Sequence, residues 1–266
     1  VGAETHSGVE VHFMAMQRLR GKTLRSVLDE AKTLPIERVL QLGHEIADGL
    51  AAIHDAGAVH RDIKPANVFV EDDGHAVIAD LGLSRLLEPR TEISLPGTFL
   101  GSIAYAAPEQ LEGFDVGPEA DLYALGVLLY EMASGKNPFH GDDLKTTMHA
   151  HANLVAPPLS RTAPGVTYLL ERVVSALLEK KPEFRLKPAR RVADILTERE
   201  RSEWWRQYVA GETGIERLSK ARRQLKVTRV TRVHGREREL ETIVDALRTA
   251  TIGRSIQEDT AFGDDM

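Results

Sequence analysis

The sequence contains no cysteine among its 266 residues. A disulfide framework, a thiolate metal site and a cysteine nucleophile are therefore excluded. A chain without cysteine suits the reducing conditions of the cytoplasm, and a cytoplasmic location is our expectation.

The chain also has no basic excess and no long apolar run. Its formal net charge at pH 7 is −6, which gives no reason to expect nucleic acid as a partner. No apolar run approaches the ~18–20 residues of a membrane-spanning helix, and no basic segment with an apolar run behind it marks a signal peptide. With 42% hydrophobic and 28% charged residues, the composition is that of a globular protein with a buried core.

The apolar residues recur with a mainly helical period. In the segment 36–57, Val39, Leu42, Ile46 and Leu50 follow one another at steps of three and four residues, which predicts a core-facing helix. The segment 120–135 is apolar nearly all round and predicts a buried helix. We expect further helices over 23–31 and 168–180, strands over 9–19, 68–70 and 76–78, a long loop over 84–106, and a surface helix with a linker after residue 196.

One short stretch, AVHRDIKPANVF (residues 58–69), places an acid, a lysine and an amide close together. Transfer of a phosphoryl group needs an acid to accept the hydroxyl proton, a cation to neutralise charge and oxygen ligands for Mg²⁺. Asp62 could accept the proton, and Lys64 could neutralise the charge. Asn67 could hold one metal ion, and Asp80, which opens the tripeptide DLG after the second predicted strand of this region, could hold another.

These segments occur in the order HRDIKPAN (60–67), DLG (80–82) and APE (107–109). In this the chain resembles the eukaryotic-type protein kinases, whose signature contains HRD with a following Asn, then DFG, then APE. The resemblance implies an α+β, protein kinase-like fold, mainly the helical C-lobe with a remnant of the N-lobe sheet and the hinge. It also implies a bacterial Hanks-type serine/threonine kinase that uses ATP and Mg²⁺ and acts on Ser/Thr of a protein substrate.

The same resemblance assigns roles in catalysis to single residues. It makes Asp62 the base, Lys64 the charge stabiliser, and Asn67 and Asp80 the Mg²⁺ ligands. Ser102 takes the position of a threonine whose hydroxyl bonds the acid and the lysine.

For the nucleotide, the resemblance makes Phe69 the floor under adenine and Met16 the gatekeeper. The Gln17 carbonyl and the Leu19 amide would be the hinge groups that bind the base, since an adenine slot is apolar with a few placed backbone polar groups.

Three further roles implied by the resemblance are structural or regulatory. Asp121 would hold the backbone around HRD, and Arg185 would pair with Glu109 in a buried ion pair that is costly to break from one side. Arg61 would bind a phosphate placed on the long loop. The candidate phosphorylation sites there are Thr91, Ser94 and Thr98.

The chain departs from the family pattern at its beginning. No glycine-rich GxGxxG loop and no VAxK segment occurs, and the first lysine of the chain is Lys22. Leu81 stands where the family has phenylalanine, which we expect to be a benign apolar replacement. The chain also opens at Val1 rather than Met. We therefore expect a kinase truncated in its small lobe and nearly inactive as it stands. Two alternatives stay open: a pseudokinase or regulatory binding module, and a small-molecule phosphotransferase of related fold.

Four parts are expected along the chain. Residues 1–20 would be the N-lobe remnant with its last strands and hinge, 21–200 the C-lobe, 201–232 a linker or helix, and 233–266 a tail or the start of a second domain. The segment VHGREREL (233–240) resembles the lead-in to a P-loop in AAA-like signalling ATPases, although no GxxxxGK[ST] follows it.

Overall fold

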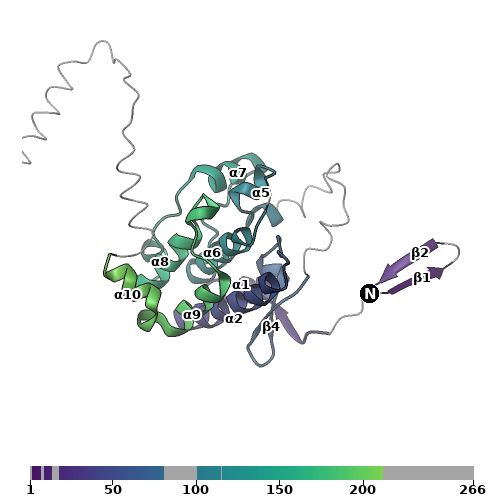
Figure 1. Ribbon diagram of the computed structural model, residues 1–266, viewed down its shortest axis with the longest axis horizontal. Coiled ribbons are helices and arrows are strands. Elements are labelled where there is room, and N and C mark those ends of the chain that lie inside the picture. Colours follow the sequence, from purple (N-terminus) through teal and green to yellow (C-terminus); the bar gives the residue numbers. More distant parts are fainter. Residues whose placement is uncertain (1, 7–8, 14–17, 81–100, 115, 212–266) are drawn as a thin grey trace, which may run out of the picture. The chain divides into compact units, whose positions relative to one another are not determined.

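The computed structural model describes residues 2–6, 9–13, 18–80, 101–114 and 116–211 (Figure 1). The chain divides into two units, Val1–Ser219 and Lys220–Met266, and the second lies wholly outside the described residues, as does the predicted ATPase lead-in.

The strands form two small antiparallel sheets. One is the hairpin of β1 (Gly2–His6) and β2 (Val9–Phe13), which confirms the first part of the strand expected over 9–19. The other has the order β3-β4-β5, with β3 (Gly21–Thr23), β4 (Val68–Glu71) and β5 (Ala76–Ile78). The β4–β5 hairpin confirms the two strands predicted on either side of the DDG turn.

Pairing of β3 with β4 brings two distant segments together. Thr23 lies opposite Phe69 and Gly21 opposite Glu71 in the antiparallel register. Gly21 has a φ of 131°, and a Cβ there would lie 2.1 Å from the carbonyl oxygen of Val70. Only glycine allows so close an approach of the two backbones. The segment that follows the predicted hinge is thereby anchored beside the strand that carries Phe69.

The rest of the described chain is helical. The predicted helices form, and Thr23 caps the first of them, its hydroxyl accepting a hydrogen bond from Ser26 N–H at 3.2 Å. No helix among the described residues is long and apolar enough to cross a membrane. The α-helices are α1 (Leu24–Ala31), α2 (Ile36–Asp55), α5 (Pro108–Leu111), α6 (Glu119–Ser134), α7 (Leu144–Asn153), α8 (Tyr168–Leu177), α9 (Ala189–Glu198) and α10 (Glu203–Val209). Short 3₁₀ turns are η1 (Pro65–Asn67), η2 (Leu159–Arg161), η3 (Pro182–Phe184) and η4 (Arg199–Arg201).

Helix α6 is the centre of the core. Every residue from Ala120 to Ala133 is buried, as its all-round apolar sequence predicts. It packs against α2 on one side and α8 on the other (Figure 1). Full burial of a large aliphatic side chain contributes about 1.5–3 kcal/mol, so this helix anchors the elements around it. The two acids it buries, Asp121 and Glu131, are exceptions that need partners.

Two helix predictions need correction. The helix expected over 168–180 ends at Leu177, three residues earlier, and the 3₁₀ turn η3 follows from Pro182. The surface helix expected after residue 196 is present as α10, but Trp204 is only 5% exposed and belongs to the core. The charged residues around this tryptophan concealed its burial, because one fully buried position in a short helix leaves no periodic pattern.

Helix α7 places a histidine inside the core. His151 is fully buried and its ring packs on Phe139, with the ring centroids 4.9 Å apart. Burial lowers the pKa of His151 to about 4, and the positive charge of Lys180 acts in the same direction, while the bond to the Ala104 carbonyl opposes both. Tyr123 on α6 supplies the other polar group that faces the ring.

This histidine should make the fold sensitive to acid. Between pH 6.5 and 4 the unfolded chain binds a proton on this imidazole and the folded chain does not, so unfolding becomes easier as pH falls through that window. The free energy of unfolding should lose up to about 3 kcal/mol from this group, at 1.36 kcal/mol for each pKa unit. Urea unfolding at several pH values should give a shallower acid slope for His151→Gln. Equal slopes for the two proteins would contradict the assignment.

Candidate active site

The loop of residues 58–67, between α2 and β4, is held by one buried carboxylate. Asp121, in the first turn of α6, is 0% exposed. Its Oδ2 accepts a hydrogen bond from His60 N–H at 2.8 Å, and its Oδ1 accepts one from Arg61 N–H at 2.7 Å. Arg61 has a φ of 67°, a left-handed conformation that residues other than glycine rarely adopt. Asp121 thus fixes an unfavourable turn of the backbone, as predicted for it.

Lys64 lies between two oxygen partners. Its Nζ donates to Asp62 Oδ2 at 2.7 Å and to Ser102 Oγ at 2.8 Å. Asn67 Nδ2 donates to the Asp62 carbonyl at 2.8 Å and to Asp62 Oδ2 at 3.0 Å. The structure therefore gathers the lysine and the amide around one carboxylate oxygen of Asp62. Within the described residues no hydrogen bond to the other oxygen, Oδ1, is present.

The residue before Asp80 is bonded to this loop through both of its backbone groups. Ala79 N–H donates to the Asn67 carbonyl at 2.9 Å, and the Ala79 carbonyl lies 3.1 Å from His60 Nε2. His60 Nδ1 accepts from the N–H of Asp62 at 3.3 Å, so Nε2 carries the proton and donates. Asp80 itself is exposed and has a φ of 55°. Asp80, the second predicted metal ligand, therefore directly follows the residue that is hydrogen-bonded to Asn67, the first predicted ligand.

The oxygen donors fit a magnesium ion. Because Asn67 Nδ2 bonds Asp62, the amide oxygen of Asn67 is left as an acceptor, and Asp80 adds an exposed carboxylate. Mg²⁺ prefers oxygen and is usually held by one or two protein groups, with water and phosphate completing its shell. No group of three His, Asp or Glu side chains that could hold a metal occurs among the described residues. Water and the phosphates of a nucleotide would complete the shell of an ion held there.

Only part of the predicted adenine site can be described. Leu19 and Phe69 are both half-buried, and the β3–β4 pairing carries the chain from Leu19 back to the strand of Phe69. The predicted positions that lie outside the described residues are Met16, Gln17, Leu81, Thr91, Ser94 and Thr98.

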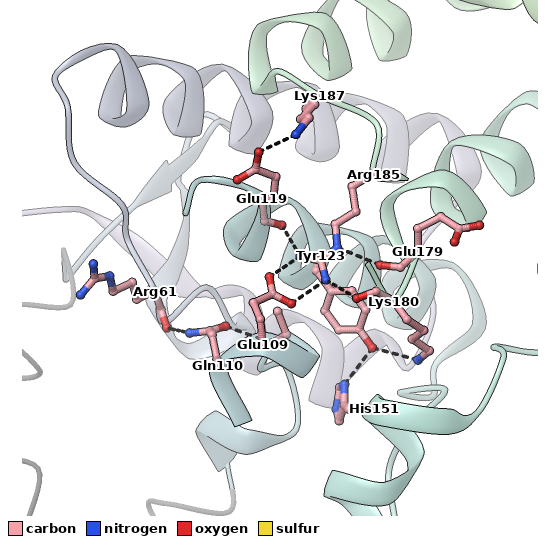
Figure 2. A network of polar contacts seen from close by, with 11 residues as sticks. Arg61, Glu109, Gln110, Glu119, Tyr123, His151, Glu179, Lys180, Arg185 and Lys187 are labelled. Atoms are coloured by element: carbon pink, nitrogen blue, oxygen red, sulfur yellow. Dashed lines mark hydrogen bonds and ion pairs between the residues drawn. The ribbon is translucent and has the colours of Figure 1, made fainter. Parts of the chain in front are cut away.

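A second buried network ties α5 to the site. Arg185 and Glu109 form the predicted pair, with Nη–Oε distances of 2.5 and 2.7 Å, and are 3% and 8% exposed. The guanidinium also donates to three backbone carbonyls, so all five of its N–H groups are used (Figure 2). Next to Glu109, the Gln110 side chain donates to the Arg61 carbonyl at 2.9 Å. The ion pair is thus connected directly to the 58–67 loop.

Lys64 also borders a groove that sequence reasoning missed. This Lys64 groove is a cavity of about 850 Å³ whose wall includes Ala104, Tyr105 and Glu131. Tyr105 Oη donates to Glu131, and Arg25 Nη1 lies 2.9 Å from the other carboxylate oxygen. Burial and the neighbouring Glu131 raise the pKa of Tyr105, so its hydroxyl stays a donor. The single acid within the apolar run LLYEMA was a signal that could have predicted a buried partner.

Breaking the Glu109–Arg185 pair from one side should be costly. Glu109→Gln would leave a buried guanidinium without its countercharge, and such a change costs about 3–5 kcal/mol. The measurement is the free energy of unfolding in urea. Glu30→Gln is the matched control, because its pair with Lys22 is exposed and should contribute no more than about 1 kcal/mol. Similar losses for the two variants would contradict the buried network.

Comparisons with known proteins agree with these observations. A model of the protein kinase domain matches residues 5–197. Serine/threonine-protein kinase PknL of Mycobacterium tuberculosis is 35% identical over 173 residues, which are 65% of this chain and 43% of that protein. Serine/threonine-protein kinase pkn2 of Myxococcus xanthus is 39% identical over 190 residues, 69% of this chain and 23% of that protein. The chain spans less than half the length of these relatives. Motifs, fold and similarity all make it a member of the protein kinase domain family, of the bacterial serine/threonine type.

Proposed function

We propose that this chain carries the catalytic loop of a protein kinase that transfers the γ-phosphoryl group of ATP to a Ser or Thr hydroxyl of a protein. The observation that carries the proposal is the position of Lys64, 2.7 Å from the Asp62 carboxylate and beside the Lys64 groove. A cation fixed against the acid, beside a cavity that a substrate segment could enter, matches the acid and the charge stabiliser that phosphoryl transfer uses.

In the reaction, the substrate hydroxyl lies against Oδ1 of Asp62. As its oxygen forms a bond to the γ-phosphorus, the bond from phosphorus to the ADP oxygen breaks and the hydroxyl proton passes to the Asp62 carboxylate. The Lys64 ammonium stabilises the negative charge on the transferred group. Little covalent chemistry is asked of the protein, so the fixed geometry of the 58–67 loop supplies most of the effect.

Mg²⁺ would neutralise phosphate charge when bound. We assign its protein ligands to the Asn67 amide oxygen and the Asp80 carboxylate, and the adenine contacts to Phe69 and Leu19, together with the predicted Met16 and Gln17. The proposed partners are ATP and a protein substrate rather than nucleic acid, in keeping with the net charge of −6. The cysteine-free composition supports a cytoplasmic location.

Acceptor choice tests this function. The product of the complete reading frame, incubated with Mg²⁺ and γ-labelled ATP, should label Ser or Thr of a protein acceptor and leave an aminoglycoside unlabelled. Labelling of the aminoglycoside instead would establish a small-molecule phosphotransferase. ATP binding with no transfer to any acceptor, while the unrelated kinase used as positive control labels the same protein, would establish a regulatory module.

Substitution of Asp62 and substitution of Asp80 should have different effects on turnover and on nucleotide affinity. Asp62→Asn should lower turnover by about 10²–10⁴, the usual contribution of a general base, and leave the affinity for Mg·ATP unchanged. Asp80→Asn should weaken Mg·ATP binding as well, because it removes a metal ligand. Nucleotide titration calorimetry and single-turnover rates separate the two effects.

Asp72→Asn is the control for both variants, since Asp72 is an exposed acid in the neighbouring β4–β5 turn. It should match the unmodified protein in both measurements. Equal losses of nucleotide affinity in Asp62→Asn and Asp80→Asn would contradict the assigned roles.

A further inference from the structure

His151 takes part in a buried polar chain that the proposed reaction does not use. Its Nδ1 lies 3.0 Å from the Tyr123 hydroxyl (Figure 2). Its Nε2 lies 3.1 Å from the Ala104 carbonyl oxygen. On the far side, Lys180 Nζ donates to the Tyr123 hydroxyl at 3.3 Å. The four residues come from α6, α7, the segment before α5 and the segment after α8, so the chain of bonds crosses the core.

The proton positions in this chain follow from its two ends. The Ala104 carbonyl can only accept, so His151 Nε2 must carry a proton and donate. The neutral ring then presents a lone pair at Nδ1, and the Tyr123 hydroxyl must donate to it. The oxygen of Tyr123 in turn accepts from Lys180, because an ammonium has no lone pair. All hydrogen bonds therefore run in one direction, from Lys180 to Ala104.

The ionisation states agree with this direction. Burial lowers the pKa of His151 to about 4, which keeps the ring neutral at pH 7. Burial raises the pKa of Tyr123, so its hydroxyl keeps the proton that it donates. Burial, with the charge of Arg185 adding to it, lowers the pKa of Lys180 to about 8, which still leaves the ammonium mostly protonated at pH 7.

The chain ends on the wall of the Lys64 groove. The Ala104 carbonyl accepts a second hydrogen bond from Asn137 Nδ2 at 2.7 Å. On one side of Ala104, Ser102 binds Lys64, and on the other, Tyr105 binds Glu131. The segment from Ser102 to Tyr105 is thus bonded at its ends to Lys64 and Glu131, which line the groove, and at Ala104 to His151 and Asn137.

We propose that His151 is a positioning residue for the protein substrate. Its Nε2–H tautomer, required by the Ala104 carbonyl and supported by the Tyr123 hydroxyl at Nδ1, fixes the Ala104 peptide group and with it the wall of the Lys64 groove. The inference rests on the proposed kinase function for the identity of what lies in the groove. A histidine that served only to fill the core would need its ring and not this tautomer.

Three substitutions separate the tautomer from the packing. His151→Gln can place an amide N–H near the position of Nε2 and keep the donation to Ala104. His151→Asn can place an amide near Nδ1, where it meets Tyr123 but does not reach Ala104. His151→Phe keeps a ring against Phe139 and loses both hydrogen bonds. A merely structural role would rank these variants by shape, with phenylalanine the mildest change.

Hydrogen exchange tests the inference in the chain itself, without catalysis. The amides to follow are Tyr105 and Ala106, which donate to the Ser102 and Ile103 carbonyls at 3.3 and 3.1 Å. Their exchange should rise about tenfold in His151→Phe and His151→Asn, the size expected for one lost buried hydrogen bond, and stay near normal in His151→Gln. Amides of α8 are the internal control and should not change.

Tyr123→Phe covers the case in which a His151 variant fails to fold. It removes the donor to Nδ1, so the ring is held by one hydrogen bond in place of two and bonds the Ala104 carbonyl less firmly, and exchange at Tyr105 and Ala106 should rise in this variant as well. Unchanged exchange in Tyr123→Phe, or equal exchange in the Gln, Asn and Phe variants at position 151, would overturn the inference.

Kinetics of the complete protein give the second readout. His151→Phe should raise KM for the protein substrate about tenfold, with KM for ATP and kcat little changed, and His151→Gln should restore KM. Effects on kcat or on KM for ATP alone would overturn the inference. If the unmodified protein transfers no phosphate, the proposed function fails, and the exchange measurement still decides the role of His151.

Discussion

One buried carboxylate supports the rest of the site. Asp121 accepts two backbone N–H groups of the 58–67 loop and also lies 2.9 Å from His54 Nε2. Its place in the first turn of α6 adds the favourable field of the helix N-terminus. A buried charge is tolerated only with such partners, and losing them would leave it uncompensated. The geometry around Asp62 therefore depends on a residue that touches no substrate.

Helix α6 joins this support to the groove. Asp121 lies near its beginning and accepts hydrogen bonds from the 58–67 loop. Glu131 lies near its end and accepts one from Tyr105 in the wall of the Lys64 groove. The Glu109–Arg185 pair adds a third fixed point, because Gln110 next to it bonds the Arg61 carbonyl. These networks surround the reacting groups with groups fixed by hydrogen bonds, and preorganised geometry is how a site with little covalent chemistry gains its rate.

The candidate site could be predicted largely from the sequence because its chemistry is local. Asp62, Lys64 and Asn67 lie in one loop, and the structure brings their side chains within hydrogen-bond reach. The central helix was equally predictable, since a segment apolar all round has nowhere to lie except the core. Asp121 and the Glu109–Arg185 pair were found through the family resemblance rather than through any periodicity.

The residues that were missed depend on partners distant in sequence. Tyr105 and Glu131 are bonded to each other in the wall of the groove, and His151 reaches the Ala104 carbonyl from another helix. No local pattern specifies such a pairing, because each member looks like an isolated polar residue in an apolar segment. Trp204 was misplaced for the related reason that a single buried position in a charged run has no period.

The central claim is that the Asp121 carboxylate sets the conformation of the 58–67 loop, and amide exchange in Asp121→Asn tests it most directly. The His60 and Arg61 amides bond different oxygens of Asp121, and an asparagine would present an NH₂ donor in place of one of these oxygens, so in the present geometry one of the two hydrogen bonds is lost. The account predicts that the exchange of at least one of these amides rises at least about tenfold while α8 amides stay protected and Asp55→Asn, an exposed control near the end of α2, changes nothing. Unchanged protection of the His60 and Arg61 amides in Asp121→Asn would contradict it.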